Sequence, residues 1–336
     1  MKGVLVKEWT EFEKLTISQD VPRPELGPRS VRIATHAAGV SFATSLVVAG
    51  RYQRKPPRPF VPGTEVSGIV TEIGSQVRNL SVGDRVVGAI DWGGMAEEAV
   101  APEATVFKIP DKLDFSVAIA LTNSYMTSYA ALTWEHLLRV GQGDSLVVHG
   151  AAGGVGIAAI EIGKILGATV IANVGSEEKR DIVLSHGADH VINYREESFR
   201  EIVQSLTDGV GANAVYDPVG GDVFMQSLRC LAPEGRICPI GFAGGDIPQI
   251  PANILLVKNL TVCGLNMGYY FGWSPTDMRW EYETRMRAMM EQLVTWWSED
   301  KIHPRVSHTF ALEDFQEAMQ VVLGRKAMGR VTLRIA

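Results

Sequence analysis

Residues 145–156, SLVVHGAAGGVG, decide the fold class of this chain. The stretch begins as a short apolar strand and passes through a glycine-rich turn into the helical segment GGVGIAAIEIGKILG. Ala151, Gly153 and Gly156 form the pattern A-x-G-x-x-G at that turn, which is the context that a dinucleotide fingerprint requires. Gly153 would let the backbone approach a pyrophosphate, and Gly156 would let the helix pack close to the strand. The alternative is a tight turn that only joins the two elements, and the strands and helices that follow favour the dinucleotide site.

Strands and helices alternate after this motif. The strands ATVIANV, DHVINY, ANAVYDPVG and GRICPIGF are separated by helical segments, and NLTVCGL follows as a last strand. Strands that alternate with helices of about ten or more residues predict a parallel sheet covered on both faces. We therefore expect an α/β fold with a doubly wound parallel sheet over residues 125–265.

The first 120 or so residues have a different pattern. Short β-branched runs such as SVRIATHAAGV and EVSGIVTEIG are separated by Gly- and Pro-rich breakers, which predicts an antiparallel, barrel-like domain. The uncharged residues 115–134 contain many Ser and Thr residues and predict a helix inside a soluble protein. The closing segments do not continue the alternation. We expect residues 1–124 and 266–336 to form one discontinuous domain around the doubly wound sheet.

Composition and charge exclude several function classes. The chain has 32 basic and 38 acidic residues, a net charge of −6, so no global field attracts nucleic acid or an anionic membrane. Three cysteines, at positions 230, 238 and 263, are too few for a disulfide framework or a four-thiolate zinc lobe. The charged segment MKGVLVKEWTEFEK lacks the apolar core of a signal peptide. We expect a soluble protein of the reducing cytoplasm.

The end of the second strand, ATVIANV, bears on the choice of nicotinamide cofactor. NAD-binding proteins place Asp or Glu there, whereas this strand runs into Ser176, and Glu177 and Glu178 come only at the start of the next helix. Ser176, Lys179 and Arg180 provide a hydroxyl and two cations for a 2′-phosphate, unless both cations are ordinary solvated helix residues. We expect NADP(H).

Several segments, taken in order, resemble one family. They are GRYQRKPPRPFVPGTEVSGIVTEIGSQV, SVGDRVVG, HGAAGGVG, GADHVINYREE, YDPVGG and the closing GRVTLRI. Over nearly its whole length the chain resembles the zinc-independent medium-chain dehydrogenases/reductases of the quinone oxidoreductase (zeta-crystallin-like) branch. The resemblance implies a Rossmann domain inserted into a GroES-like antiparallel β-barrel catalytic domain.

Two positions separate the chain from the zinc-dependent members of that family. Those members carry Cys in the loop that here contains Ser41, and His in a G-H-E motif where this chain has Thr64. Ser and Thr do not replace a thiolate and an imidazole as zinc ligands. The histidines, including His36 and His149, have no ligand spacing and are interpreted as structural or surface residues. We expect no metal.

The resemblance also implies a set of cofactor residues. They are Ser41, Thr127, Ala151, Gly153, Gly154, Val155, Gly156, Ser176, Lys179, Tyr194, Val219, Gly220, Gly241, Phe242, Ala243 and Arg325. Ser176, Lys179 and Tyr194 would hold the adenosine phosphate end, and residues 219–220 and 241–243 would line the nicotinamide. Lys326 and Arg330 compete with Arg325 for the same alignment.

Without a metal, the chemistry implied is hydride delivery to an electron-poor acceptor. That acceptor is a quinone or, alternatively, an α,β-unsaturated carbonyl or acyl thioester; a non-enzymatic NADPH-binding relative is a further alternative. Tyr52 matches a tyrosine that enoyl reductases of the family use near the carbonyl, and a phenol donates a hydrogen bond at neutral pH. The other interpretation of Tyr52 is a pocket wall.

Two features allow more than one interpretation. Ser41 and Thr44 stand where quinone oxidoreductases usually show Asn and an acid, so contacts to the nicotinamide ribose stay open. The aromatic, Met-rich residues 266–290 would suit a flat apolar acceptor, or equally a core or a dimer contact. NLTVCGL would leave an exposed sheet edge near residues 260–265, and relatives dimerise there, so we expect a homodimer.

Overall fold

The computed structural model describes residues 1–336, and the chain divides into two compact units. Unit 1 consists of Met1–Asn123, Met267–Thr295 and Pro304–Ala336, and unit 2 consists of Ser124–Asn266 and Trp296–His303. No helix of the structure combines the length and the apolarity needed to cross a bilayer.

The stretch Trp296–His303 belongs to unit 2, whereas the sequence pattern predicts that all of residues 266–336 belong to the first domain. The backbone N–H of His303 donates to both carboxylate oxygens of Glu161, at 3.1 and 3.0 Å. The ring of Trp296 lies 5.5 Å from that of Tyr129. These long-range contacts attach the stretch to unit 2, and no local pattern of the sequence indicates them.

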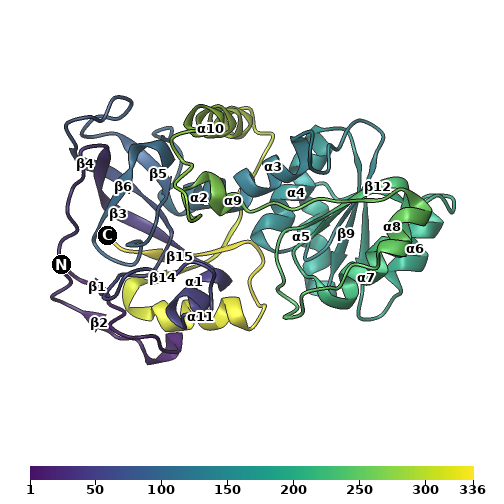
Figure 1. Ribbon diagram of the computed structural model, residues 1–336, viewed down its shortest axis with the longest axis horizontal. Coiled ribbons are helices and arrows are strands. Elements are labelled where there is room, and N and C mark those ends of the chain that lie inside the picture. Colours follow the sequence, from purple (N-terminus) through teal and green to yellow (C-terminus); the bar gives the residue numbers. More distant parts are fainter. The chain divides into compact units, whose positions relative to one another are not determined.

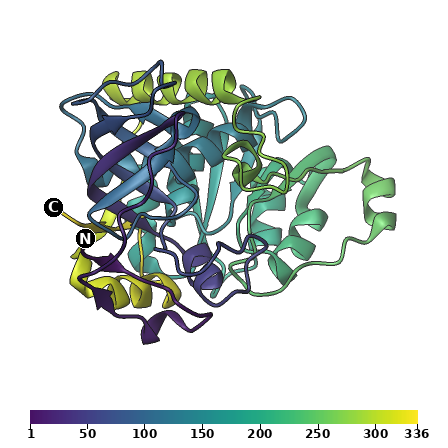
Figure 2. The same cartoon turned by 60° about the vertical axis from the view of Figure 1, so that its left-hand side comes forward.

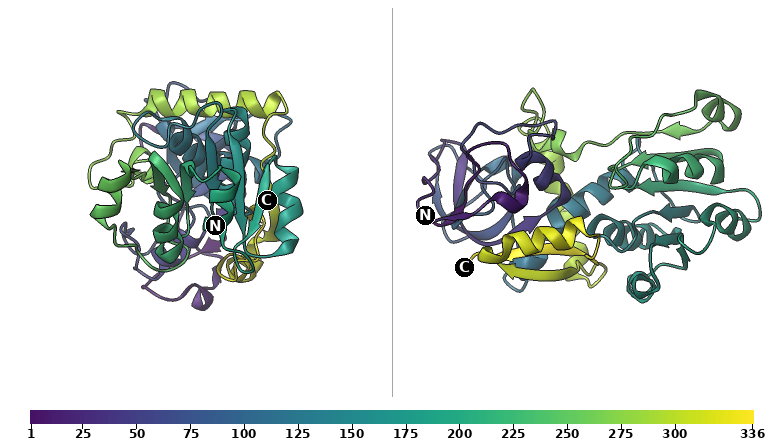
Figure 3. Two further views of the ribbon diagram at one scale, coloured as in Figure 1. Left: turned by 90° about the vertical axis from the view of Figure 1, so that its right-hand side faces the viewer. Right: turned by 90° about the horizontal axis from the view of Figure 1, so that it is seen from below.

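Unit 2 is built on a six-stranded parallel sheet in the order β10-β9-β8-β11-β12-β13; Figure 1 labels β9 and β12 of this sheet. Its strands are β8 (Ser145–Val148), β9 (Thr169–Val174), β10 (His190–Asn193), β11 (Ala212–Asp217), β12 (Leu231–Pro239) and β13 (Thr261–Val262). Helices lie on both faces of this sheet (Figure 3), which confirms the predicted α/β class. The strand order reverses between β8 and β11, and doubly wound sheets bind ligands at the carboxyl ends of the strands beside such a point.

The helices of unit 2 follow the strands in alternation. They are α3 (Met126–Thr133), α4 (Gly154–Ile165), α5 (Arg180–Ser185), α6 (Phe199–Leu206), α7 (Gly221–Cys230) and α8 (Ala252–Lys258). Helix α8 contains no buried residue, and Leu256 and Val257 are 78% and 76% exposed. Figure 2 shows α8, in green, at the outer edge of the unit.

The expected helix over residues 115–134 is interrupted. Helix α2 (Phe115–Ala120) is followed by a π-helical turn, Leu121–Tyr125, before α3 begins. In this turn the Thr122 hydroxyl is 3.0 Å from the Ile119 carbonyl and 3.3 Å from Glu65 Oε1, which lies far away in the sequence. A π-turn changes the face that the following residues present, and hydropathy along the chain does not reveal it.

Unit 1 is a barrel-like sheet of seven strands. The path runs β14-β15-β3-β4-β5-β7, and β6 pairs with β3. All pairs are antiparallel except the parallel pair of β14 and β15. The strands are β3 (Ser30–Val40), β4 (Glu65–Ile73), β5 (Arg85–Ala89), β6 (Glu98–Pro102), β7 (Val106–Lys108), β14 (Val306–Ala311) and β15 (Arg330–Arg334), with a separate pair β1 (Gly3–Val4) and β2 (Ile17–Ser18).

The helices of unit 1 cover the barrel. Besides α2 they are α1 (Phe42–Val48), α9 (Met267–Tyr270), α10 (Glu283–Ser298, whose last three residues group with unit 2) and α11 (Phe315–Leu323). Helix α1 packs against α11, and the rings of Phe12 and Phe315 meet edge to face at 5.5 Å. The C-terminal strand β15 pairs with β3, so segments from both ends of the chain form one core.

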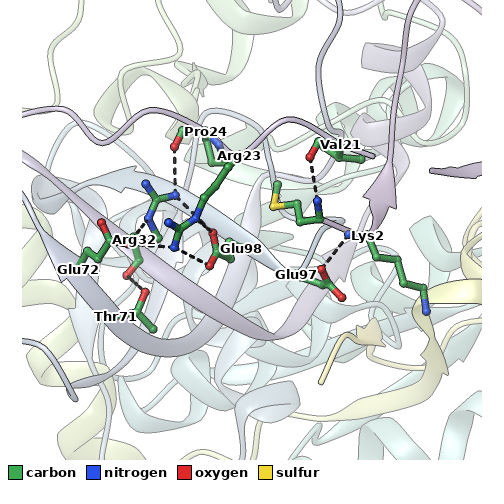
Figure 4. Close-up of polar contacts among 10 residues, drawn as sticks. Lys2, Val21, Arg23, Pro24, Arg32, Thr71, Glu72, Glu97 and Glu98 are labelled. Atoms are coloured by element: carbon green, nitrogen blue, oxygen red, sulfur yellow. Dashed lines mark hydrogen bonds and ion pairs between the residues drawn. The ribbon is translucent and has the colours of Figure 1, made fainter. Parts of the chain in front are cut away.

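A network of arginines and glutamates links the N-terminal segment to the barrel (Figure 4). Arg32 on β3 is 5% exposed, and its Nε is 3.1 Å from Glu72 on β4. Its Nη1 reaches the carbonyl of Pro24 at 3.1 Å and Glu98 on β6 at 3.5 Å. Arg23 joins the same two carboxylates, at 2.9 Å from Glu72 and 2.5 Å from Glu98. The network therefore ties three strands and the N-terminal segment together.

Candidate functional site

The glycine-rich turn connects the end of β8 to the start of α4. Gly153 is the N-cap residue of α4, and the first intrahelical bond runs from Ile157 N to Gly153 O at 2.9 Å. The N–H groups of the first turn have no acceptor within the helix, so they are available to an anion. A Cβ on Gly156 would lie 2.5 Å from Gly150 O and 2.6 Å from Ala151 Cα. Only glycine fits at position 156, because the helix touches the turn there.

A buried histidine supports this turn from behind. The Nε2 of His149 is 2.7 Å from Ser227 Oγ, and its Nδ1 is 2.9 Å from the amide nitrogen of Asn173 on β9. Burial lowers the pKa of His149, so the ring is neutral. Since the Asn173 amide donates to Nδ1, the ring proton is on Nε2 and is donated to Ser227. His149 thus has the structural role that its spacing suggested.

The predicted phosphate residues lie at the carboxyl ends of β9 and β10. A Cβ on Gly175 would be 2.6 Å from the hydroxyl of Tyr194, so the Tyr194 ring, 42% exposed, lies directly beside the turn that contains Ser176. Arg180 is bonded to Glu177 at 2.8 Å and to the Val191 carbonyl at 3.1 Å. The structure therefore brings Ser176 and Tyr194 together at the carboxyl edge of the sheet, whereas Arg180 is paired with the carboxylate of Glu177.

The turn after β11 is organised by a residue that the sequence analysis did not single out. Asp217 is fully buried, and its Oδ1 accepts bonds from Val219 N at 2.8 Å and Gly220 N at 3.1 Å. Gly220 has a φ of +77°, and a Cβ there would be 2.8 Å from the ring of Phe242. Ala243 N is 3.0 Å from the Pro218 carbonyl. An acid that ends a buried apolar strand, as in YDPVGG, was the signal for Asp217.

Three buried polar atoms beside these turns lack a protein partner. They are the Thr127 Oγ1 on α3, with the residue 6% exposed, the Asp217 Oδ2, and the Oδ1 of Asn173, whose backbone carbonyl accepts from Ala151 N. Buried polar groups are normally hydrogen-bonded, so a donor and two acceptors of this kind suit the amide and hydroxyl groups of a dinucleotide. Together with the glycine-rich turn, these atoms make the residues of unit 2 fit such a cofactor.

Three of the predicted site residues belong to unit 1. Ser41 is the N-cap residue of α1, and its Oγ is 3.1 Å from Thr44 Oγ1. Tyr52 is half-buried in the loop after α1, and burial raises the pKa of its phenol, which is therefore protonated at neutral pH. Arg325 follows α11 with a φ of +56°. Its competitor Arg330 is buried and paired with Glu65, whereas Lys326 is exposed.

The aromatic residues of 266–290 pack on one another within unit 1. Tyr270 lies 5.4 Å from Tyr269 and 5.0 Å from Tyr282, measured between ring centroids. Phe271 is 1% exposed, and the guanidinium of Arg29 lies 3.3 Å above the ring of Trp280. Part of the segment therefore serves as core.

The residues that replace the zinc ligands do not fit a metal. Ser41 Oγ is bonded to Thr44, and position 64 carries a second hydroxyl. Hydroxyl groups are poor ligands for Zn²⁺ beside thiolates and imidazoles. No group of three or more His, Cys, Asp or Glu side chains is arranged to hold a metal ion.

Comparisons with known proteins match this architecture. The family model of the alcohol dehydrogenase GroES-like domain matches residues 27–111, and that of the zinc-binding dehydrogenase matches residues 154–285. A quinone oxidoreductase-like protein 2 homolog from Nematostella vectensis is 42% identical over 322 residues, which is 95% of this chain and 85% of the relative.

Solved structures agree along the whole chain. Escherichia coli quinone oxidoreductase complexed with NADPH has a TM-score of 0.89 at 28% identity, and both chains are covered over 100% of their length. A 2-haloacrylate reductase has a TM-score of 0.84 at 27% identity, covering 100% of this chain and 99% of that one. The chain belongs to the medium-chain dehydrogenase/reductase family, in its quinone oxidoreductase branch.

Proposed function

We propose that this protein is an NADPH-dependent oxidoreductase that transfers hydride to a quinone without the help of zinc. The observation that carries the proposal is the glycine-rich turn between β8 and α4, where Gly156 allows the helix to touch the turn. The first N–H groups of α4 would bind the pyrophosphate there. The NADPH in the structure of the E. coli relative supports the choice of cofactor.

The preference for NADPH over NADH rests on the end of β9. No carboxylate follows Val174 directly, so nothing there would bond the ribose 2′-hydroxyl of NADH or repel a 2′-phosphate. We assign the phosphate to Ser176 and Lys179, with the adenine against the ring of Tyr194. Arg180, 2.8 Å from Glu177, balances the charge of the nearest acid.

The remaining residues would position the two reactants. Thr127 and the Asp217 turn would hold the nicotinamide, bordered by Val219, Gly220 and residues 241–243, and bound NADPH would supply the hydride. From unit 1, Ser41 and Arg325 are proposed to contact the cofactor. Tyr52 would donate a hydrogen bond to the oxygen that becomes negative as the acceptor is reduced. Its raised pKa keeps the phenol protonated for this role.

An α,β-unsaturated carbonyl or acyl thioester is the second candidate acceptor. The 2-haloacrylate reductase, which shares this fold, is named for the reduction of an activated alkene and favours that candidate. A quinone and an enone make the same demand on Tyr52, because both accumulate negative charge on a carbonyl oxygen. A protein that binds NADPH and catalyses nothing is the third candidate.

One panel of assays separates the three candidates. NADPH and then NADH are oxidised in the presence of quinones, enones and enoyl thioesters, and kcat/KM is measured for each pair. We expect the highest value with NADPH and a quinone. Tight NADPH binding without turnover of any acceptor would leave only the binding role, and equal kcat/KM with NADH and NADPH would remove the assignment of Ser176 and Lys179.

The role of Tyr52 is tested separately. The Tyr52→Phe variant should keep the NADPH affinity and lose kcat about 10- to 100-fold, because one hydrogen bond to the developing charge is removed. Tyr129→Phe is the matched control, since Tyr129 is a half-buried tyrosine of unit 2 whose ring packs on Trp296. An unchanged kcat for Tyr52→Phe would assign Tyr52 to the pocket wall.

We also propose a homodimer that forms through β13, in the reducing cytoplasm. β13 is an edge strand, and a partner chain would cover it. The same unit exposes the apolar residues Ile247, Leu256 and Val257, which favours a partner surface there. Three unpaired thiols suit a reducing compartment. A monomer in light scattering would exclude the dimer, and cell fractionation tests the compartment.

A further inference from the structure

Two cysteines face each other across neighbouring strands of unit 2. Strands β12 and β13 are parallel, with Arg236 opposite Thr261 and Ile237 opposite Val262. The pairing continues by one residue, because Cys263 N bonds to Ile237 O at 3.0 Å. Cys238 and Cys263 are therefore the next opposed pair. Their side chains share one face of the sheet, since Ile237 and Val262 share the other.

Their separation suits a covalent bond. Neighbouring strands lie about 4.8 Å apart, which falls within the Cα separations of about 4.4–6.8 Å found in disulfides. The Cys263 thiol bonds to the carbonyl of Ile237, the residue before Cys238, at 3.4 Å, so it lies against the strand that carries Cys238. The third cysteine, Cys230, is too far from Cys238 to bond with it. Leu231, which follows Cys230, pairs with Ala212 on β11, whereas Cys238 pairs with Tyr216 on the same strand. Four residues of strand rise separate those positions by about 13 Å.

The two thiols differ in chemical character. The interaction between the two neighbouring thiols, with burial adding to it, raises the pKa of Cys238 above its usual range. The same interaction lowers the pKa of Cys263 against the effect of burial, and the nearby Arg236 lowers it further. The thiolate is the nucleophilic form of cysteine. In the single chain Cys263, which directly follows the edge strand β13, is 6% exposed, while Cys238 is fully buried.

We propose that Cys238 and Cys263 form a reversible redox site of this protein, with hydrogen peroxide as the oxidant. The Cys263 sulfur attacks peroxide, breaks its O–O bond and becomes a sulfenic acid, and one hydroxide leaves as water. The Cys238 sulfur then attacks that sulfur, the S–S bond forms and a second water leaves. The two thiols lose two electrons and two protons, and the peroxide is reduced to two waters.

The bond would act on the adjacent turn. Cys238 is followed by Pro239 and then by residues 240–243, which are tied to the Asp217 turn through Ile240 N to Asp217 O, at 2.7 Å. A disulfide draws the Cβ atoms to about 3.8 Å and sets a dihedral near 90°, so the carboxyl end of β12 must shift toward β13. This effect rests on the proposed NADPH site, whereas formation of the bond does not. We expect NADPH affinity to fall about tenfold in the oxidised protein, since small displacements of positioning groups have large effects.

Thiol counting and mass spectrometry test the bond directly. The reduced chain has three free thiols. After peroxide treatment and alkylation in denaturant, we expect one alkylated thiol, a mass about 2 Da lower before alkylation and a peptide that links Cys238 to Cys263. Cys230→Ser should form the same bond, and Cys263→Ser and Cys238→Ser should not. Three remaining thiols, a bond to Cys230, or a link between two chains in non-reducing electrophoresis would overturn the proposal.

The NADPH titration is read separately. Wild type should bind NADPH more weakly after peroxide and recover with dithiothreitol, while Cys263→Ser should bind equally before and after. A disulfide that leaves NADPH affinity unchanged would overturn the effect on the turn. A reduced protein that does not bind NADPH would refute the proposed function, and the thiol count would still decide whether the redox site exists.

Discussion

The buried ion pair of Glu65 and Arg330 tests whether an acid in a family motif has a structural role in this chain. Glu65 stands at the acid position of the segment Gly63-Thr64-Glu65, which resembles the G-H-E motif of zinc-dependent relatives. Here its side chain is 1% exposed and paired with Arg330, which is 10% exposed. Gly39 makes room for the pair, because a Cβ there would lie 2.6 Å from Glu65 Oε2 and 2.9 Å from Arg330 Nη2. We predict that both residues stabilise unit 1 and that neither acts on the cofactor.

The magnitude follows from burial. Removing one partner of a buried ion pair leaves an uncompensated charge and costs about 3–5 kcal/mol. Glu65→Gln should cost about 3 kcal/mol, at the lower end, because Gln keeps the shape and the bond from Thr122. Arg330→Met should cost a similar amount. The double variant should cost about as much as either single change, since the stranded charge is gone, which implies a coupling of about 3 kcal/mol.

Urea unfolding followed by tryptophan fluorescence measures the double-mutant cycle, and NADPH titration provides the readout for unit 2. Glu11→Gln is the matched control, because Glu11 pairs with Arg51 at 2.9 Å but both side chains are more than half exposed. It should change stability by less than about 0.5 kcal/mol. Additive costs in the double variant, or Glu65→Gln with unchanged stability and impaired NADPH binding, would refute the structural role.

Three further predictions concern unit 2. Gly156→Ala should lower the free energy of unfolding by about 1–3 kcal/mol and weaken NADPH binding, because the new Cβ would lie 2.5 Å from a backbone atom. Gly264→Ala is its control in the same urea and NADPH titrations, because no atom lies within 4 Å of the added Cβ. Equal behaviour of the two variants would contradict the close packing at Gly156. Tyr125→Phe should cost about 1–3 kcal/mol, since the phenol is 2.6 Å from the buried Glu161, and a loss below about 0.5 kcal/mol in urea unfolding would count against that bond. Burial lowers the pKa of His149, so the unfolded chain takes up more protons below about pH 6.5. Wild type should therefore lose stability as the pH falls from about 6.5 toward the lowered pKa, by up to about 1.4 kcal/mol per pH unit. The difference in unfolding free energy between wild type and His149→Asn, measured in urea, should shrink over that range. A constant difference would contradict a neutral His149.

Local pattern was enough for the doubly wound sheet and the glycine-rich turn. The apolar run of β8, the turn beginning at Gly150 and the period of α4 are all encoded within about 20 residues, and each constrains the backbone by itself. The same holds for the strand ends that carry Ser176 and Tyr194. The residues of unit 1 that are predicted to complete the site, Ser41, Tyr52 and Arg325, rest on family resemblance.

What the sequence by itself determined is the class of protein: an α/β sheet with a dinucleotide-type turn, preceded by a barrel-like domain, with no cysteine–histidine set for zinc. The tertiary structure decided the pairings that join distant residues. It pairs Arg330 with the buried Glu65, and it places the backbone of His303 in hydrogen-bonding distance of Glu161. It also positions Asp217 to bond the backbone of its turn, and it places Cys238 opposite Cys263. Secondary structure follows from neighbours a few residues apart, whereas each of these contacts depends on strand order and register across the whole fold, which no local pattern specifies.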